Sequence, residues 1–252
     1  MTPLELFGLI CVFAVVRAAM SLRPVSVPDG GGGSATTSSG STVAVIREYL
    51  DAFIVAGLVA LFLITFVVRT FFIPSGSMEP TLQIHDVLLA NEFEYRFHKP
   101  SDGDIVVFKP PIPSTNDFIK RVMASPGQTL RIHNGVVYRN GVALTEPYIA
   151  AKPDYELVVK NYAIYVDNQP LDPTVANIPP RADWTAPDRI PKDCYFMMGD
   201  NRNDSEDSHI WGFAQPDGTF FAGPLKGQRA EFTGHAFLVF WPINRIHVLT
   251  TY

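Results

Sequence analysis

The stretch LRIHNGVVYRNGVAL, from Leu130 to Leu144, places two Asn-Gly pairs between short runs rich in apolar residues. Asn134-Gly135 and Asn140-Gly141 can each supply the positive φ angles that a tight hairpin turn requires. The runs beside the turns are too short for helices and favour extended backbone. The stretch therefore predicts β-hairpins at both pairs.

Runs of the same kind continue on both sides of this stretch, and no long helical period occurs after Ile73. Residues 74–252 are therefore expected to form a mainly β domain. Within it, eight prolines between Glu146 and Asp193 predict a surface excursion without regular secondary structure, at about residues 147–191. The strands that we predict are Val87–Ala90, Ile105–Phe108, Phe118–Met123, Tyr195–Met198 and Ala236–Trp241.

An uncharged apolar stretch, AFIVAGLVALFLITFVV, occupies the 17 positions from Ala52 to Val68. A helix of this sequence would be apolar on every side and long enough to cross a hydrocarbon layer about 30 Å thick. Together with its flanks, the stretch predicts a transmembrane helix at residues 47–73.

A shorter apolar segment, Leu6 to Val16, lies between Glu5 and Arg17. If Arg17 extends its side chain toward the lipid headgroups, residues 1–27 can hold a first transmembrane helix. The domain would then follow one or two such helices. Residues 28–46 are rich in Gly and Ser and predict a flexible linker, and the arginines around the linker place it in the cytoplasm.

The composition excludes several classes of protein. A net charge of −5 provides no large basic field, so we expect no nucleic-acid partner. The two cysteines, Cys11 and Cys194, cannot build a disulfide framework or a thiolate zinc site, and the six histidines lack metal-binding spacing. We therefore expect no metal and no other cofactor.

Four segments after the long apolar stretch carry polar residues in a characteristic order. They are IPSGSMEPTL (residues 73–82), DGDIVVFKP (102–110), DFIKRVMASPG (117–127) and MGDNRNDSEDSHIWG (198–212). In this order after a membrane helix, they resemble the bacterial type I signal peptidases, also called leader peptidases. The resemblance covers essentially all of the chain after Ile73 except the proline-rich excursion.

The resemblance implies a signal-peptidase-like antiparallel β catalytic domain preceded by one or two N-terminal transmembrane helices. Members of this family are serine endopeptidases that remove signal peptides from exported preproteins, cutting after small residues at positions −1 and −3. The implied partners are signal peptides and the lipid bilayer of the bacterial cytoplasmic membrane, with the catalytic domain on the extracytoplasmic, periplasmic side. We expect a monomer.

The resemblance also implies roles for individual residues. Ser77 matches the nucleophile and Lys120 the general base of a Ser-Lys dyad, whereas the Ser75 hydroxyl and the Ser77 N–H match the oxyanion hole. Ser205 would hydrogen-bond the lysine amine and orient it. The residues that match supporting ion pairs are Arg121, Asp200 and Asp207. Substrate would lie as an extended strand beside residues 73–75 and 117–119, against Phe71, Ile73, Pro74, Leu82, Asp117, Phe118 and Ile119.

The chemistry of the dyad sets a condition on Lys120. A serine hydroxyl becomes an effective nucleophile only when a base accepts its proton. An amine with the ordinary lysine pKa of about 10.4 is protonated at neutral pH, so it serves as a base only where burial disfavours the ammonium. In FIKRVM, strand alternation puts Phe118, Lys120 and Val122 on one face, which is expected to surround the amine with apolar groups.

One segment departs from the family pattern. Residues 202–209 read RNDSEDSH, whereas the family commonly shows RDNSxDSR. Asn and Asp are exchanged, and His209 takes the place of the last arginine. We therefore expect Asp207 to contact His209 in a way that depends on pH.

Three other functions compete with this interpretation. Another Ser-Lys protease, such as a self-cleaving repressor, would carry DNA-binding helices where this chain has its apolar stretch. A Ser-His-Asp hydrolase would need a G-x-S-x-G elbow, which is absent. A non-catalytic, membrane-anchored binding module with the same fold is the alternative from a different class, and the presence of all four residues Ser75, Ser77, Lys120 and Ser205 argues against it.

Overall fold

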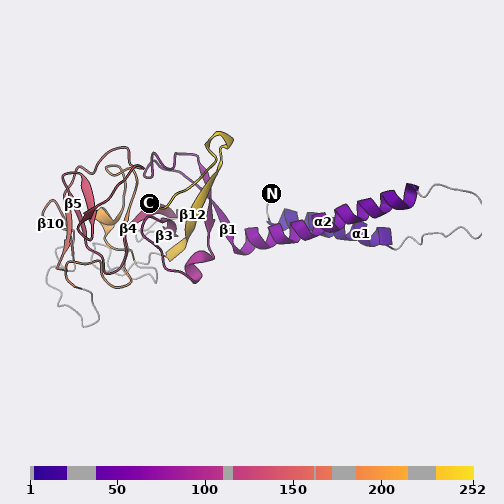
Figure 1. The fold of residues 1–252 in the computed structure, drawn as a ribbon, viewed down its shortest axis with the longest axis horizontal. Coiled ribbons are helices and arrows are strands. Elements are labelled where there is room, and N and C mark those ends of the chain that lie inside the picture. The colour runs from indigo at the N-terminus through magenta and orange to yellow at the C-terminus, as the bar shows by residue number, and fades with distance from the viewer. Residues whose placement is uncertain (1–2, 22–37, 110–115, 162, 172–185, 215–230) are drawn as a thin grey trace, which may run out of the picture. The chain divides into compact units, whose positions relative to one another are not determined.

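The computed structural model describes residues 3–21, 38–109, 116–161, 163–171, 186–214 and 231–252 (Figure 1). The chain divides into two compact units, Met1–Val68 and Arg69–Tyr252. Each unit has its own secondary structure, helical in the first and mainly β in the second.

The first unit is a pair of helices, α1 (Pro3–Ser21) and α2 (Ser38–Phe66). Ile10 of α1 is buried against Gly57 of α2, where a Cβ would lie 2.8 Å from the Ile10 Cγ1, so the glycine permits the close approach. Arg17 forms an ion pair with Asp51, with 2.8 Å between Nε and Oδ1. Within the described residues, neither helix combines the length and the apolarity that a membrane crossing requires.

The helix bounds differ from the predicted ones. Residues 38–46 begin α2 rather than continue a flexible linker, in keeping with the preference of serine for helix starts. At the other end, Val68–Phe72 form strand β1 instead of the end of a membrane helix. Hydropathy does not distinguish a helix from a strand, and β1 is held by hydrogen bonds to its neighbour β2. Residues 22–37, which include parts of the predicted first membrane helix and linker, lie outside the described residues.

The second unit contains two antiparallel sheets, which confirms the predicted mainly β class. The larger sheet has the order β1-β2-β12-β3-β4-β11, with β13 paired to β12. Its further strands are β2 (Val87–Asn91), β3 (Ile105–Lys109), β4 (Phe118–Ala124), β11 (Phe196–Met198), β12 (Glu231–Trp241) and β13 (His247–Val248). These strands include the five segments predicted from sequence, except that Tyr195 forms only an isolated bridge to Ala214.

The smaller sheet has the order β10-β9-β8-β5-β6-β7. Asn134-Gly135 and Asn140-Gly141 join β5 to β6 and β6 to β7 with positive φ at all four residues, so both hairpins are confirmed. The strands are β5 (Leu130–His133), β6 (Val136–Arg139), β7 (Val142–Ala143), β8 (Leu157–Lys160), β9 (Ala163–Val166) and β10 (Gln169–Pro170).

The predicted surface excursion at about residues 147–191 is wrong for its first half. Strands β8 and β9 lie within it and form the centre of the smaller sheet. Leu157, Val159 and Ile164 are almost completely buried in the core that this sheet shares with β11 and the end of β4. The prolines lie before and after β8 and β9 and not within them. The number of prolines in the segment therefore gave no indication of these two runs of β-forming residues. Residues 172–185 lie outside the described part of the chain.

Short helices also occur among the described residues of the second unit. They are the 3₁₀ turns Glu94–Arg96 and Ile243–Arg245 and the single-turn α3 (Ser208–Trp211). Strand β4 occupies an interior position of the larger sheet, with β3 on one side and β11 on the other. The backbone of β4 is therefore held on both sides, and most of its side chains have little access to water.

Candidate active site

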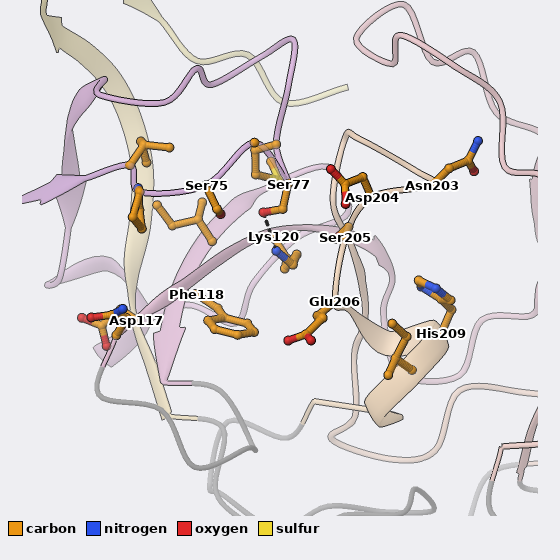
Figure 2. Close-up of a pocket in the computed structure, with 17 residues that line it drawn as sticks. Ser75, Ser77, Asp117, Phe118, Lys120, Asn203, Asp204, Ser205, Glu206 and His209 are labelled. Carbon is orange, nitrogen blue, oxygen red and sulfur yellow. Dashed lines mark hydrogen bonds between the residues drawn. The ribbon is translucent and has the colours of Figure 1, made fainter.

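A pocket of about 610 Å³ in the second unit brings three distant segments together. One wall is the turn that contains Ser75, Gly76 and Ser77, another is the start of β4, and the third is the segment 203–210 (Figure 2). Within the described residues, no group of three or more His, Cys, Asp or Glu side chains could hold a metal ion. The polar side chains that line the pocket include serines, a lysine, carboxylates and an imidazole.

Ser77 and Lys120 meet at the centre of this pocket. The Nζ of Lys120 lies 2.8 Å from the Oγ of Ser77, although the residues are 43 positions apart in sequence (Figure 2). The distance suits transfer of a proton in either direction, because a neutral amine would accept the hydroxyl hydrogen along the same line. The pair has the arrangement of a nucleophile and its base.

Lys120 is buried, with a relative exposure of 3%. The Phe118 ring lies on one side of it, with its centroid 5.3 Å from Nζ. Burial lowers the pKa of Lys120 to about 8 from the ordinary 10.5, although the nearby carboxylates of Asp207, Glu206 and Asp200 act in the opposite direction. A useful fraction of the amine is thus uncharged near neutral pH.

The residue after the lysine, Arg121, makes a buried ion pair with Asp200. Both arms of the guanidinium contact the carboxylate at 2.8 Å, and the two side chains are 1% and 0% exposed. Arg121 also donates to the carbonyls of Gly103 at 2.9 Å and Thr250 at 3.3 Å. This planar, bidentate contact fixes the loop at residue 200 against β4.

Asp207 and His209 make the contact expected from the departure in sequence. The Nδ1 of His209 lies 2.6 Å from Oδ1 of Asp207, and the imidazole stacks on the ring of Tyr155 at 4.5 Å. Asp207 also accepts a hydrogen bond from the backbone N–H of Gly199. The carboxylate therefore connects α3 to the loop that follows β11.

The predicted hydrogen bond from Ser205 to the lysine amine is absent from the structure. The Ser205 side chain is buried beside the dyad, but its hydroxyl has no hydrogen-bond partner among the described residues. Ser205 instead lies tightly against Gly199, where an added Cβ would lie 2.6 Å from the Ser205 Cβ. The tight packing at Gly199 could not be read from the motif alone.

The turn of Ser75, Gly76 and Ser77, the candidate nucleophile turn, carries two hydrogen-bond donors. Ser75 is exposed and lines the pocket beside Ser77 (Figure 2). Neither the Ser75 hydroxyl nor the Ser77 N–H donates a hydrogen bond to another described residue. Both groups are thus free to bind an oxygen of a ligand.

Most of the predicted substrate-binding residues line the pocket, namely Ile73, Pro74, Asp117, Phe118 and Ile119. Phe71 and Leu82 do not. Leu82 is fully buried in a hydrophobic core cluster that also contains Ile73 and Met78. Phe71 is partly buried and packs against this cluster. Sequence reasoning took both for pocket walls because an apolar residue near a site gives no signal of whether it faces the pocket or the core.

Sequence reasoning also missed one wall of the pocket. This wall consists of Asn203, Asp204, Glu206, His209 and Ile210. Two further lining residues that were not predicted are Met78 and Asn116. The first five flank Ser205 within a single motif, and this proximity was the available signal. They give that wall two carboxylates and an imidazole.

Comparison with known proteins adds a second kind of information. The profile of the family described as signal peptidase, peptidase S26, matches residues 46–241. A probable signal peptidase I-2 of Synechocystis is 37% identical over 202 residues, covering 78% of this chain and 74% of the relative. A probable signal peptidase I-1 of the same organism is 37% identical over 79% of this chain and 85% of its own length. The signal peptidase I of Leptolyngbya laminosa is 35% identical over 72% of this chain and 73% of its own length.

Proposed function

The chain belongs to the signal peptidase family, peptidase S26, and on this premise we propose that it removes signal peptides from preproteins by acyl transfer through Ser77 and Lys120. Membership of this family argues against the self-cleaving repressor, and the contact between Ser77 and Lys120 argues against the non-catalytic binding module. The observation that carries the proposal is the 2.8 Å contact between Lys120 Nζ and Ser77 Oγ in a pocket with a buried amine.

The first half of the proposed reaction forms an acyl-enzyme. Uncharged Lys120 takes the hydroxyl proton of Ser77 as Oγ attacks the carbonyl carbon of the residue before the cut. The Ser77 N–H and the Ser75 hydroxyl donate to the resulting oxyanion. The ammonium of Lys120 then gives its proton to the leaving amine, and the mature protein departs.

The second half releases the signal peptide. A water molecule gives a proton to Lys120 as its oxygen attacks the ester carbonyl carbon. Collapse of the second tetrahedral intermediate breaks the bond to Ser77 Oγ, which recovers its proton from the lysine. The amine is thereby returned to its uncharged form.

The proposed substrate is an extended segment with small side chains at positions −1 and −3. It would lie along residues 73–75 and 117–119, where Ile73 and Ile119 line the pocket with relative exposures of only 3% and 9%. Both side chains are packed into the apolar core behind the pocket, so they offer the substrate an apolar wall.

The proposal is tested by incubating the full-length protein in detergent with a preprotein that carries an Ala-x-Ala sequence before its cleavage site. Mass spectrometry of the product should show a single cut after the second alanine. Absence of this cut in several detergents, with the folded state verified by circular dichroism, would reject the proposed activity.

The pH dependence of turnover follows from the state of Lys120. The uncharged amine is the base, and burial lowers its pKa to about 8. We expect kcat/KM to rise about tenfold per pH unit up to pH 8 and to become level above it. Initial rates between pH 6 and 10 measure this profile, with circular dichroism at each pH as the control for folding. A rate that falls as the pH rises through 8 would contradict a lysine base.

We further propose that the first unit anchors the enzyme to the bacterial cytoplasmic membrane, with the β unit on the extracytoplasmic side. The support is the stretch from Ala52 to Val68, which carries no charged residue. The side chains of residues 63–66 lie outside the described part of the structure. Phe53, Val55 and Val59 expose more than half of their surface, and burial in lipid would remove that apolar surface from water.

The anchor predicts how the protein fractionates. Full-length protein should stay with membranes during alkaline carbonate extraction, whereas the double substitution Val55→Asp with Val59→Asp should shift it toward the soluble fraction, because each charge is costly in hydrocarbon. Val142→Asp is the matched control, since Val142 is 67% exposed on a hairpin of the β unit. Release of the unmodified protein by carbonate would contradict the anchor.

A further inference from the structure

Asn201 holds the nucleophile turn by two hydrogen bonds. Its backbone N–H donates to the Ser77 carbonyl at 3.1 Å, and its side-chain amide donates to the Gly76 carbonyl, also at 3.1 Å. The Gly76 carbonyl accepts a second hydrogen bond from the Glu79 N–H at 3.0 Å. Through Asn201, the loop after β11 is therefore hydrogen-bonded to the peptide units on both sides of the Ser77 Cα.

The contact with Gly76 controls the direction of the Ser77 N–H. The Gly76 C=O and the Ser77 N–H belong to one peptide unit, which is planar. The cis bonds in the described residues precede Pro80 and Pro242, so this peptide unit is trans. In a trans unit the C=O and N–H point in opposite directions. An amide that holds the Gly76 oxygen on one side therefore aims the Ser77 N–H to the other side.

Gly76 makes such control necessary. Glycine has wide conformational freedom, so the peptide unit that follows it can rotate at low cost unless something holds it. The Ser77 N–H donates to no other described residue and belongs to a residue that lines the pocket. The direction of the Ser77 N–H is consequently set by the hydrogen bonds that the Gly76 carbonyl accepts.

The loop that carries Asn201 is also held to the strand that carries Lys120. Asn201 follows Asp200, whose carboxylate receives both arms of Arg121 at 2.8 Å. Arg121 in turn follows Lys120 on β4. One continuous set of contacts thus joins the strand that carries the lysine to the peptide unit that carries the Ser77 N–H.

We propose that Asn201 is a positioning residue for the oxyanion hole, which aims the Ser77 N–H at the oxygen that becomes negative in the transition state. The proposal rests on the function proposed above. It concerns an interaction that strengthens only as the tetrahedral intermediate forms, so its loss should lower kcat with little change in KM. A residue that only stabilised the loop would affect substrate binding and thermal stability as well.

Two substitutions test the proposal. Asn201→Ala removes the amide donor without adding charge, and Asn201→Asp keeps the shape but puts an acceptor against the Gly76 oxygen. We expect kcat for a preprotein substrate to fall on the order of 10- to 100-fold in both, with KM within about twofold of wild type. Rates are compared on the plateau above pH 8, where a change in the protonation of Lys120 has least effect.

A ligand pair separates positioning from general damage. A peptide boronic acid forms a bond to Ser77 Oγ and places a boronate oxygen in the oxyanion hole, whereas the product peptide ending in Ala-x-Ala does not form this adduct. Asn201→Ala should weaken boronate binding by about the same factor as kcat, with product binding unchanged. Asn201→Asp should do the same, and its matched control is Asn140→Asp, the same chemical change in the β6–β7 turn, where the side-chain oxygen still accepts from the Thr129 N–H. It should leave both affinities unchanged.

The outcomes are distinguishable. Wild-type kcat and boronate affinity in both Asn201 variants would overturn the positioning role while leaving the peptidase intact. Equal weakening of boronate and product binding would also overturn it, because that pattern indicates a collapsed pocket. Failure of the wild-type protein to cut any preprotein would instead count against the proposed function itself.

Discussion

Replacing Lys120 with methionine is expected to lower the processing rate by about 10³- to 10⁴-fold while making the folded protein more stable. A positioned general base contributes roughly 10²- to 10⁴-fold, and without it the Ser77 hydroxyl has no described group in hydrogen-bond contact to take its proton. Methionine has a similar length and no charge, so it can fill the same space beside Phe118. Lys120→Arg should be equally inactive, because arginine remains protonated.

The gain in stability follows from the pKa of the lysine. Burial lowers the pKa of Lys120 in the folded protein to about 8, whereas the unfolded chain has the ordinary value near 10.5. Between these values the unfolded state binds more protons, so stability rises with pH across the window from 8 to 10.5. Below pH 8 the full cost of burying the ammonium, about 3 kcal/mol, is present. Methionine removes that cost.

Thermal unfolding at pH 7 and pH 10.5 measures this effect. The increase in Tm for Lys120→Met should be large at pH 7 and small at pH 10.5, where the folded lysine is uncharged and only about half of the unfolded lysines carry a charge. Lys192→Met, at an exposed position, is the control and should change neither Tm nor rate. Processing by Lys120→Met at more than about 1% of the wild-type rate would reject the lysine as base, given the size of the effect expected of it. Ser77→Ala combined with Lys120→Met should be no slower than either change alone, since the two residues act as a unit.

Gly199→Ala is expected to have the second largest effect, a loss of processing of about 100-fold or more. A Cβ at this position would overlap the Ser77 carbonyl oxygen and the Ser205 hydroxyl and would lie 2.6 Å from the Ser205 Cβ. The first of these is backbone of the nucleophile itself, so it cannot rotate away as a side chain would. The turn that carries Ser77 must therefore move, and a shift of 1 Å is enough to disrupt the dyad.

Gly141→Ala separates this effect from a loss of stability. Gly141 has a φ of 77°, so alanine there is strained, but its Cβ would meet no atom within 4 Å. Both alanine variants should lower Tm, whereas Gly199→Ala alone should stop processing. Normal kcat in Gly199→Ala would show that the close approach of Ser77 and Ser205 is not needed for catalysis.

The parts of the fold that were predictable from sequence are those with a local cause. Asn134-Gly135 and Asn140-Gly141 fix turn geometry within a few residues, and Ile105–Phe108 has the β-branched and aromatic composition that favours a buried strand. The end of α2 was not predictable in this way. Val68, Phe71 and Phe72 continue the apolar run around Arg69, and the segment is a strand because β2, which begins 15 residues after its end, provides hydrogen bonds.

The site shows the same division. Ser77 and Lys120 were identified by resemblance to a family, since their spacing of 43 residues carries no physical signal of its own. The contacts around them depend on tertiary packing. Leu82 faces the core rather than the pocket, and the Ser205 hydroxyl lies beside the dyad without a hydrogen bond. Asn201 gives no signal in the sequence, because its role depends on two acceptors, the carbonyls of Gly76 and Ser77, that lie more than 120 residues earlier.

The wide separation of the pocket's segments along the chain has a consequence for how the protein is made. The amide of Asn201 is synthesised 125 residues after the Gly76 carbonyl that it holds. At ribosomal speeds of about 5–20 residues per second, this interval is roughly 6–25 s. Throughout that time a nascent copy carries Ser77 without the Asn201 contact, although Lys120 follows Ser77 by only 43 residues. The proposed oxyanion hole is therefore completed only after the chain beyond β11 has been synthesised.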